Sequence, residues 1–375
     1  MDLKTERLEE WKNGKKMPPV RIELHPTDRC NLNCKFCWQN SATNKDYSKE
    51  LSEDKLLAIV DEAAEMGVKE WIISGGGEPL VRKSATLKIL ERIKEHGMWG
   101  QLTTNGTLLA DDDVKKLVEI GWDQVQFSID GHDAATQDYL RGASGAFEKS
   151  TAAVKLFSKW KAKLNSDKPF VGFNTVLNRL NFDKMQQMIE LAHSVGSQLV
   201  YVEPIYGGYL TTERLTLNNE EIKKFQQLSG KAMETAKNLG VQTNLGHFAE
   251  TFLIDKSSFE KTVIGEVASI HTENNFACAP CFQPWYLMGI KGCGLAGCCS
   301  SFEVGEYIHS KTLEEIWYGK VFEKIRGDMM KKIIPSFCEK CSVVVVMENR
   351  RIRKEFLSRK SGWQRIKILK NKLGF

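Results

Sequence analysis

Three closely spaced cysteines near the start of the chain limit the folds and chemistries open to it. They stand in the stretch Cys30-Asn31-Leu32-Asn33-Cys34-Lys35-Phe36-Cys37, just after the segment from Val20 to Leu24. Three thiolates at this C-x3-C-x2-C spacing can bind three irons of a cubane iron–sulfur cluster. The next cysteine in the chain is Cys278. We therefore expect the fourth iron to stay open for a substrate or cofactor, as the open position of a catalytic zinc does.

Helical and strand-like patterns alternate through the first two thirds of the chain. A helix is expected from the N-cap candidate Ser52 to Gly67, followed by a buried strand from Val68 to Ser74. Further helices are expected around Thr86–Glu95, Asp111–Glu119, Phe147–Ala162, Phe182–Ser194 and Glu220–Asn238, and further strands around Gln101–Thr104, Gln124–Ile129, Phe170–Leu177, Gln198–Pro204 and Val241–Asn244. Repeated strand–helix units predict a parallel sheet with functional sites at the carboxyl ends of its strands.

A glycine-rich motif ends the strand from Val68 to Ser74. It reads Ser74-Gly75-Gly76-Gly77-Glu78-Pro79. Glycines let the backbone approach a ligand, and the neighbouring amides and acid can hold an ammonium group. The cysteine spacing alone also allows a zinc site with His25 as the fourth ligand.

The cysteine loop has the form C-x3-C-x-aromatic-C, with Phe36 in the aromatic position. Together with the glycine motif, this loop resembles the radical S-adenosylmethionine (SAM) superfamily. The resemblance implies that SAM chelates the open iron of a [4Fe-4S] cluster and is cleaved to a 5′-deoxyadenosyl radical, which abstracts hydrogen from a substrate carbon. It implies an α/β fold, a partial (βα)6 TIM-like barrel, over roughly residues 20–246. It also implies that Gly76, Gly77 and Glu78 hold the SAM amine.

Polar residues follow the later strand ends as well. Thr103-Thr104-Asn105-Gly106 and Ser128-Ile129-Asp130-Gly131 end two strands, and Arg141 precedes Gly142. The resemblance implies cofactor-binding roles for Asn105, Ser128, Asp130 and Arg141, whereas turn and cap chemistry explains the same residue types without a ligand. Asn174 and Glu203 lie near the next two strand ends, where they either face SAM or substrate or are structural. Glu203 is also a catalytic candidate.

Seven further cysteines occur in the second half of the chain, beyond a charged segment at 254–273. They are Cys278, Cys281, Cys293, Cys298, Cys299, Cys338 and Cys341. The last two form a C-x2-C pair, which needs another pair to complete a tetrahedral or cubane site. With Cys278 and Cys281 this pair would resemble a zinc ribbon. With Cys281 and Cys299 it would match an iron–sulfur site.

The second pairing resembles the auxiliary-cluster region of the SPASM/twitch branch of the same superfamily. The resemblance rests on the spacing from Gly294 to Cys299, the hairpin strand expected over 287–290, and the segment 313–317. It implies a small α+β cysteine-rich domain with one fully ligated auxiliary [4Fe-4S] cluster. Its ligands would be Cys281, Cys299, Cys338 and Cys341.

Three of these cysteines are left without a ligand role. In some radical SAM epimerases a free cysteine returns a hydrogen atom to the substrate radical, so Cys298 and Cys293 are catalytic candidates. The alternative for them, and for Cys278, is that of a small buried side chain.

The net charge of +5 is unevenly distributed along the chain. Residues 349–375 contain ten Lys or Arg and one acid, Glu355, so this tail carries +9 and the remainder −4. Apolar residues from Ile352 to Leu373 recur every three to four positions, which predicts a basic amphipathic helix over 346–375. The helix either lies on an anionic membrane surface or packs on the barrel. Nucleic acid is not expected, because no RNA-binding motif accompanies the charge.

The start of the chain indicates a cytoplasmic protein. Residues 1–16 are charged and contain no apolar signal-peptide core, and no run in the chain approaches the ~18 apolar residues of a membrane span. Ten cysteines in such a chain are expected to be metal ligands rather than disulfides. If the tail binds lipid, the location becomes peripheral at the inner membrane face.

These observations predict a radical SAM oxidoreductase or epimerase in four parts. They are an extension (1–19), the barrel (20–250), the auxiliary-cluster domain (251–345) and the tail helix (346–375). The extension is shorter than the leader-peptide-binding domain of many peptide-modifying relatives, which favours a sugar, cyclitol or lipid-linked glycan as substrate. A flavodoxin- or ferredoxin-type electron donor is expected. The alternatives are a ribosomal-peptide maturase and a non-catalytic iron–sulfur or zinc redox adaptor.

Overall fold

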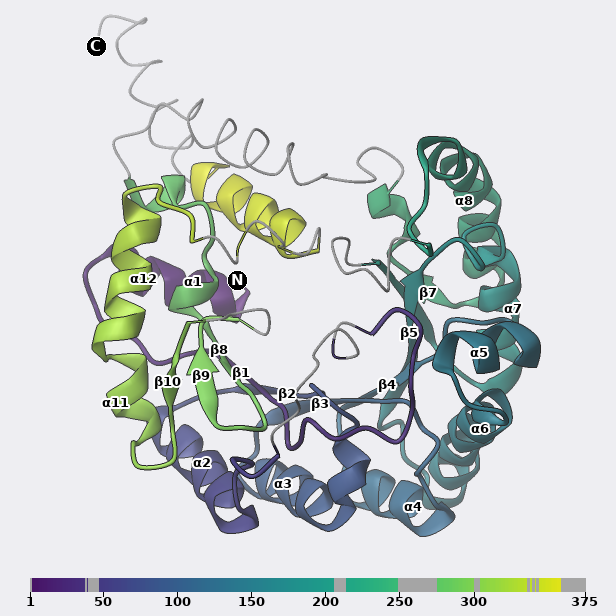
Figure 1. Cartoon of the computed structure of the whole chain (residues 1–375), viewed down its shortest axis with the longest axis horizontal. Coiled ribbons are helices and arrows are strands. Elements are labelled where there is room, and N and C mark those ends of the chain that lie inside the picture. Colours follow the sequence, from purple (N-terminus) through teal and green to yellow (C-terminus); the bar gives the residue numbers. More distant parts are fainter. Residues whose placement is uncertain are drawn as a thin grey trace, which may run out of the picture.

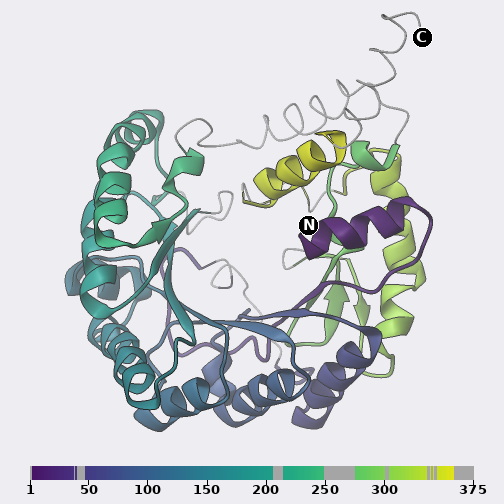
Figure 2. The same ribbon diagram turned by 180° about the vertical axis from the view of Figure 1, so that it is seen from behind.

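The structure is a computed structural model, and it describes residues 2–37, 39, 47–205, 214–248, 275–299, 304–335, 338, 341 and 344–358. Figure 1 shows a strongly curved sheet whose convex side is covered by helices and whose concave side faces the middle of the molecule. Figure 2 shows the same open ring from behind. We call the concave side of this sheet the lumen.

The described strands form one ten-stranded sheet in the order β10-β9-β8-β1-β2-β3-β4-β5-β6-β7. Their bounds are β1 Arg21–Leu24, β2 Glu70–Ile73, β3 Trp99–Thr104, β4 Gln124–Ser128, β5 Phe170–Leu177, β6 Leu199–Pro204, β7 Gln242–Thr243, β8 Leu287–Ile290, β9 Leu295–Gly297 and β10 Glu306–Tyr307. Neighbours from β8 through β1 to β7 are parallel, and β9 and β10 are antiparallel. The predicted parallel α/β barrel is confirmed.

Helices α2 to α8 cover the convex face of this sheet (Figure 1). The helices are α1 Leu3–Lys12, α2 Glu53–Met66, α3 Lys83–Glu95, α4 Asp111–Glu119, α5 Ala134–Arg141, α6 Ala146–Leu164, α7 Met185–Val195, α8 Asn219–Leu239, α11 Leu313–Trp317 and α12 Lys320–Met330. Each helix predicted over 52–244 is present within a few residues of its expected bounds. The short α1 and α5 were not predicted.

Local sequence signals explain where these helices begin and end. Ser52 Oγ accepts a hydrogen bond from the Lys55 N–H at 3.2 Å, which caps α2 as predicted. Gly67 ends α2 with a φ of 87°, a left-handed conformation that glycine adopts at low cost. Asn218 and Glu221 form a capping box at the start of α8.

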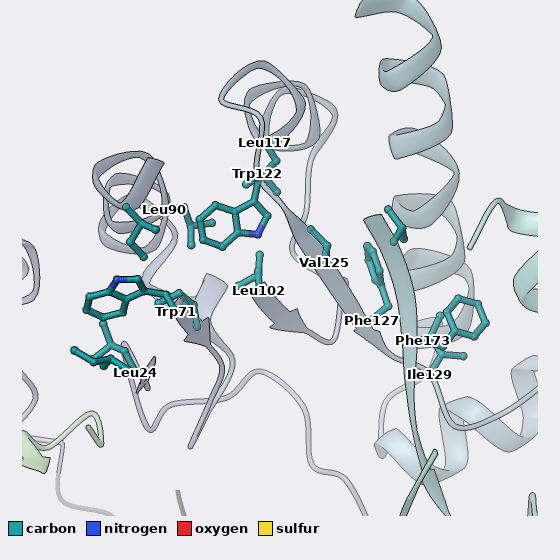
Figure 3. Close-up of a cluster of buried hydrophobic side chains, with 14 of the residues drawn as sticks. Leu24, Trp71, Leu90, Leu102, Leu117, Trp122, Val125, Phe127, Ile129 and Phe173 are labelled. Atoms are coloured by element: carbon teal, nitrogen blue, oxygen red, sulfur yellow. The ribbon is translucent and has the colours of Figure 1, made fainter. Parts of the chain in front are cut away.

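The main core lies between the convex face of the sheet and the helices. Figure 3 shows Trp71, Leu102 and Trp122 in this layer, and all three are fully buried. The Trp71 indole donates to Met98 Sδ at 3.2 Å. A Cβ on Gly100 would lie 2.1 Å from the Trp122 ring, so glycine at this position of β3 lets the indole lie flat on the strand. This layer fixes the strand ends that carry the site.

The cysteine-rich region does not form a separate sheet. Strand β8 adds to the free edge of β1 with Arg21 opposite Leu287, and β9 returns antiparallel to it. The hairpin predicted from residue 287 is therefore present. It also extends the barrel sheet, because β1 would otherwise present an unpaired edge. The hairpin turn after Ile290 thus lies at the same end of the sheet as the loops after β1 and β2.

Residues 344–358 form a helix that packs against α1 and the cysteine-rich region. Lys4 on α1 forms an ion pair with Glu348, and Arg351 contacts Asp2 at 2.7 Å. Ile352 and Phe356, which belong to the predicted amphipathic face, are buried in the second core. Of the two alternatives for the tail, packing holds for 344–358, and residues 359–375 lie outside the described residues. No helix of the described part has the length and apolar character needed to cross a membrane.

Candidate active site in the barrel lumen

The three-cysteine loop lies after β1, at the carboxyl end of the parallel strands. Thr27 Oγ1 and the Asp28 N–H both donate to the Glu50 carboxylate, at 2.6 and 3.0 Å. Arg29 forms an ion pair with the same carboxylate at 3.3 Å. Glu50 therefore anchors the segment that leads into Cys30, and nothing in the sequence pattern indicated this role.

The glycine motif after β2 packs directly on this loop. The Gly77 N–H donates to the Thr27 carbonyl at 3.0 Å, and the Glu78 N–H donates to the Arg29 carbonyl at 2.8 Å. A Cβ on Gly77 would lie 1.9 Å from the Arg29 carbonyl oxygen, and one on Gly76 would lie 1.9 Å from Asp28 Oδ1. The sequence interpretation was that these glycines let a ligand approach. In the structure they let the cluster loop approach, so they fix where the cysteines stand.

The Glu78 carboxylate is buried and joins the ends of β2 and β3. It accepts hydrogen bonds from Thr104 Oγ1 at 2.6 Å, from the Asn105 N–H at 2.7 Å and from the Leu80 N–H at 3.1 Å. Burial raises its pKa, although these bonds and Arg141 oppose the shift. Glu78 is therefore held rigidly at the loop junction, and a role toward the SAM amine stays a prediction.

Asn105 links the end of β3 to the cluster loop. Its Nδ2 donates to Asn31 Oδ1 at 2.9 Å, and its Oδ1 accepts from the Thr107 N–H at 2.9 Å. The second bond is the turn chemistry that the sequence allowed as an alternative. Asn31, which lies between the first two cysteines, was not singled out from the sequence.

Arg141 connects the cluster loop to the end of β4. Its Nη1 lies 3.6 Å from Cys34 Sγ, its Nη2 forms an ion pair with Asp130, and its guanidinium carbon lies 5.4 Å from the centre of the Phe36 ring. The Nε atom of Arg141 is buried and has no hydrogen-bond partner. The negative charge of Asp130 raises the Arg141 pKa, so the guanidinium stays charged beside the cysteines. Arg141 thus places a cation against the predicted cluster.

Asp130 and Ser128, the other two predicted residues at the end of β4, differ in exposure. Asp130 is fully buried, and its Oδ1 accepts from the Val176 N–H at 2.7 Å, which ties β4 to β5. Ser128 is half-buried and stands level with Asn174 of β5. Its carbonyl accepts from the Gln137 side chain of α5 at 3.1 Å. The structure therefore brings Asp130, but not the Ser128 side chain, into contact with Arg141.

Polar residues line the concave face of the sheet, whereas the convex face is apolar. Successive strand residues point to opposite faces, and Glu23 alternates with the fully buried Ile22 and Leu24 on β1. Glu203 lies near the end of β6, on the same lumen side of the sheet. Its charge interacts with that of Glu23, although β1 and β6 are not neighbours in the sheet. The two carboxylates therefore lie close enough for their charges to interact.

The protonation of Glu203 is shifted toward neutral pH. Burial, and then the charge of Glu23, raise its pKa to about 7, against a hydrogen bond from Asn174 that lowers it. The Asn174 Oδ1 atom is buried without a hydrogen-bond partner. Glu23 itself is bonded to Ser74 Oγ at 3.0 Å. A carboxylate with a pKa near neutrality can accept or release a proton near physiological pH, so Glu203 stays a catalytic candidate.

Cys281, Cys299, Cys338 and Cys341 lie beyond the other end of the β8–β9 hairpin, and the first three are close enough for their charges to interact. The charges of Cys281 and Cys299 act on Cys338, and the Cys341 N–H donates to the Cys338 carbonyl at 3.0 Å. This is the set that the second pairing predicted. Cys278 is buried at the end of the turn 275–278.

The two candidate hydrogen donors lie at opposite ends of the hairpin. Cys298 is 4% exposed, and its thiol is hydrogen-bonded to Cys299. Cys293 lies in the turn, where its N–H bonds to Asp28 of the cluster loop and its carbonyl accepts from His309 at 3.0 Å. The intervening strand β9 has three residues, or about 10 Å at ~3.3 Å per residue. Of the two, only Cys293 lies beside the first cysteine loop.

The donor chemistry of both cysteine sets fits an iron–sulfur cluster. All ten cysteines are described, and none forms a disulfide. Burial raises the pKa of Cys30 and raises that of Cys281 to about 12, so these thiols need nearby positive charge to act as thiolates. Iron supplies that charge. Among the described residues, no three His, Cys, Asp or Glu side chains surround a single metal-ion position.

The comparison with known proteins identifies the first half of the chain. Residues 24–192 match the model of the radical SAM superfamily. The AdoMet-dependent heme synthase of Methanosarcina barkeri is 35% identical over 184 residues, which are 49% of this chain and 50% of that protein. The PqqA peptide cyclase of Granulibacter bethesdensis is 29% identical over 227 residues, which are 60% of this chain and 58% of that protein. The match thus spans little more than half the length of these relatives.

A solved structure resembles a larger part of the chain. The crystal structure of Streptococcus suis SuiB bound to precursor peptide SuiA superimposes with a TM-score of 0.63 at 17% identity, over 85% of this chain and 69% of that one. The predicted family, branch and cofactors, SAM and [4Fe-4S] clusters, are confirmed by the family model and the curated relatives. The likeness to SuiB confirms the predicted fold class alone. The predicted sugar, cyclitol or lipid-linked glycan substrate is wrong. PqqA peptide cyclase is named for a peptide, and the SuiB structure contains a bound precursor peptide.

Proposed function

We propose, from the premise that this chain is a radical SAM protein whose domain spans residues 24–192, that it is an enzyme that modifies a peptide at a C–H carbon. The observation that carries the chemistry is the Arg141 guanidinium 3.6 Å from Cys34, where three cysteines share a loop at the mouth of a polar lumen. The peptide substrate is supported by the likeness to a peptide cyclase. The short extension 1–19 is no argument against this substrate.

The residues of the first loop would bind and orient the cofactors. When bound, the [4Fe-4S] cluster and SAM supply a 5′-deoxyadenosyl radical that abstracts hydrogen from the substrate. Cys30, Cys34 and Cys37 would hold the cluster, and Phe36 lies under Arg141. The Arg141 guanidinium would bind a carboxylate, because Arg presents several donors in a fixed plane. Gly76, Gly77 and Glu78 would complete the cofactor site, because their backbone holds the cluster loop in place.

The lumen residues would receive the substrate. Glu203 and Glu23 are acceptors whose charges interact, and the pKa of Glu203 of about 7 allows it to take a proton there. Oxidation with loss of two hydrogens is the outcome we propose. Cys298 is buried and hydrogen-bonded to Cys299, so an epimerase would have to use Cys293, beside the cluster loop, as its hydrogen donor. An external donor of the flavodoxin or ferredoxin type would supply the electron.

The second cysteine set would hold one auxiliary [4Fe-4S] cluster. Cys281, Cys299, Cys338 and Cys341 would ligate its four irons, so this cluster would carry electrons rather than bind substrate. The region 251–345 would form the auxiliary part, after a barrel over 20–250 and before a tail over 346–375. Contact of residues 359–375 with a membrane surface stays a separate hypothesis.

The enzymatic proposal is tested by SAM cleavage. Protein reconstituted anaerobically with iron and sulfide is mixed with SAM and dithionite, and 5′-deoxyadenosine is quantified by liquid chromatography. Product that depends on dithionite is expected from the wild type and not from the Cys30→Ala, Cys34→Ala, Cys37→Ala variant. Absence of product from protein with complete clusters would favour the non-catalytic redox adaptor.

The substrate class is tested in the native host. Peptide extracts from cells with and without this gene are compared by mass spectrometry, and the three-cysteine variant serves as the complementation control. A peptide about two mass units heavier is expected to accumulate in the deletion strain, because two hydrogens are then not removed. An isobaric peptide with changed retention would indicate epimerisation. Unchanged peptides together with active SAM cleavage would refute the peptide substrate.

A further inference from the structure

Asn349 places a fixed amide against Cys281, one of the four predicted ligands of the auxiliary cluster. It lies on the helix 344–358 and is 4% exposed. Its Oδ1 accepts from the Phe282 N–H at 2.7 Å, and its Nδ2 donates to the Val345 carbonyl at 2.8 Å and lies 3.6 Å from Cys281 Sγ. Because a backbone N–H can only donate, Oδ1 must face Phe282. The NH2 group must therefore face the sulfur.

The same helix holds the segment of Cys281 from both sides. Arg353, which is 5% exposed, donates to the Ala277 and Ala279 carbonyls at 3.2 and 2.8 Å. Glu348 accepts from the Tyr286 hydroxyl at 3.0 Å, beyond Cys281 in the sequence. Buried bonds of this kind keep the helix and the loop in one relative position. The Asn349 amide is thus unable to swing away from Cys281 without breaking several hydrogen bonds.

We propose that Asn349 is a positioning residue that raises the reduction potential of the auxiliary cluster by donating a hydrogen bond to the Cys281 sulfur. A reduced cluster carries more negative charge on its sulfurs, so an N–H dipole aimed at a sulfur stabilises the reduced state more than the oxidised state. The buried surroundings strengthen this preference. The inference goes beyond the proposed function and rests on it only for the assignment of Cys281 as a cluster ligand.

The test measures the potential of the auxiliary cluster alone. The full-length Cys30→Ala, Cys34→Ala, Cys37→Ala variant is the parent, so that about four irons should remain, all in the auxiliary cluster. Asn349→Leu removes both the donor and the acceptor at similar volume. Asn349→Asp keeps an acceptor for the Phe282 N–H but offers no donor to the sulfur. Ile352→Val on the same helix is the matched control, because Ile352 is fully buried and apolar.

Each variant is titrated electrochemically and followed by electron paramagnetic resonance, with iron content measured in parallel. At a fixed potential, the ratio of reduced to oxidised cluster should fall about threefold to tenfold in Asn349→Leu, where tenfold corresponds to about 59 mV for a one-electron couple. The fall in Asn349→Asp should be at least as large, since a negative charge is added. Ile352→Val should keep the parent midpoint, and all three variants should keep the parent iron content.

Several results would overturn the inference. One is an unchanged midpoint in both Asn349 variants at full iron content. Another is loss of iron from both variants, which would make Asn349 a residue of the scaffold only. If only Asn349→Leu loses iron, the other variant is used. An unchanged midpoint in Asn349→Asp would then overturn the inference, and a lowered midpoint would support it. A shift in Ile352→Val as large as in Asn349→Leu would assign the effect to packing. A parent without iron would refute the cluster assignment itself, before any Asn349 variant is compared.

Discussion

The Nη1 atom of Arg141 lies 3.6 Å from the Sγ atom of Cys34. The same guanidinium forms an ion pair with the buried Asp130 and lies over the Phe36 ring. Arg141 is the last residue of α5, and Gly142 ends that helix with a φ of 65° against the Asn33 carbonyl. One side chain therefore joins the cluster loop to the ends of β4 and α5, and its buried Nε is left for another acceptor.

Arg141→Lys should weaken SAM binding about tenfold or more while leaving the iron content intact. Lysine keeps the charge but cannot reach Asp130 and a second acceptor with a planar fork, and a charged hydrogen bond contributes about 1.5–3 kcal/mol. SAM affinity is measured by anaerobic isothermal titration. Arg179→Lys, at an exposed pair with Glu221, is the control. Wild-type affinity in Arg141→Lys would argue that this residue serves the fold only.

Gly77→Ala should remove most of the iron of the first cluster, about half of the total. Its Cβ would lie 1.9 Å from the Arg29 carbonyl oxygen, so the loop that leads into Cys30 must move. Iron analysis after reconstitution checks this. Gly230→Ala in α8 meets nothing within 4 Å and should keep full iron while gaining about 0.5–1 kcal/mol of stability. Equal iron in both variants would contradict the packing argument.

Much of the barrel was predictable because its signals are local. The Ser52 cap, the Gly67 stop and the apolar face between them define α2 without any tertiary information. The exact bounds of α4 and β5 follow from equally strong patterns. Helix α5 was missed because its eight residues hold only a short apolar pattern. The pairing of β8 with β1 was missed because an edge is closed by a segment far away in the sequence, and no local pattern encodes that choice.

The site was predictable by residue type but less so by role. Cys30, Cys34 and Cys37, together with Glu78, Asp130 and Arg141, were all identified from motifs, and the structure brings these six residues to one end of the sheet. In the structure, however, the hydrogen bonds of Glu78 and Asn105 join neighbouring loops to one another. Asn349 was counted only as part of a basic tail, because its contact with Cys281 spans 68 residues of sequence. A contact between residues so far apart produces no recognisable motif in the sequence.

Cys338→Ala combined with Cys341→Ala should remove about four irons and abolish the productive reaction, while SAM binding is retained. These two cysteines belong to the second cysteine set, away from the loop that would bind SAM. Iron analysis and SAM titration on the same sample check both parts. Unchanged iron content would show that this pair is not a cluster ligand.

Cys278→Ala and Cys299→Ala distinguish the two cysteine pairings. If Cys299 is the ligand, Cys299→Ala should lose the auxiliary cluster and Cys278→Ala should retain it, because the charge of Cys299 acts on Cys338. The opposite result would support the zinc-ribbon pairing. Electron paramagnetic resonance of the reduced proteins identifies which cluster is lost.

Glu203 should make stability depend on pH in the direction opposite to a paired surface carboxylate. Its pKa is raised from 4.5 to about 7, first by burial and then by Glu23. The folded state therefore binds its proton more tightly than the unfolded state does. Glu203 destabilises the fold above pH 7, the penalty declines as the pH falls from 7 to 4.5, and below that it vanishes. We expect a full penalty of about 2 kcal/mol, less than the whole shift because the side chain is only half-buried.

Glu203→Gln should thus melt about 2–5 °C higher than the wild type at pH 8, and the difference should shrink toward pH 5. Melting is followed by anaerobic differential scanning fluorimetry of the reconstituted protein. Glu65→Gln on the exposed side of α2 is the control and should give the same small difference at both pH values. If Glu203 also takes a proton during turnover, kcat/KM rises through pH 7 in the wild type and this rise is absent in Glu203→Gln. A melting difference that is independent of pH would mean that Glu203 is ionised normally, and the acceptor role in the lumen would then pass to Glu23.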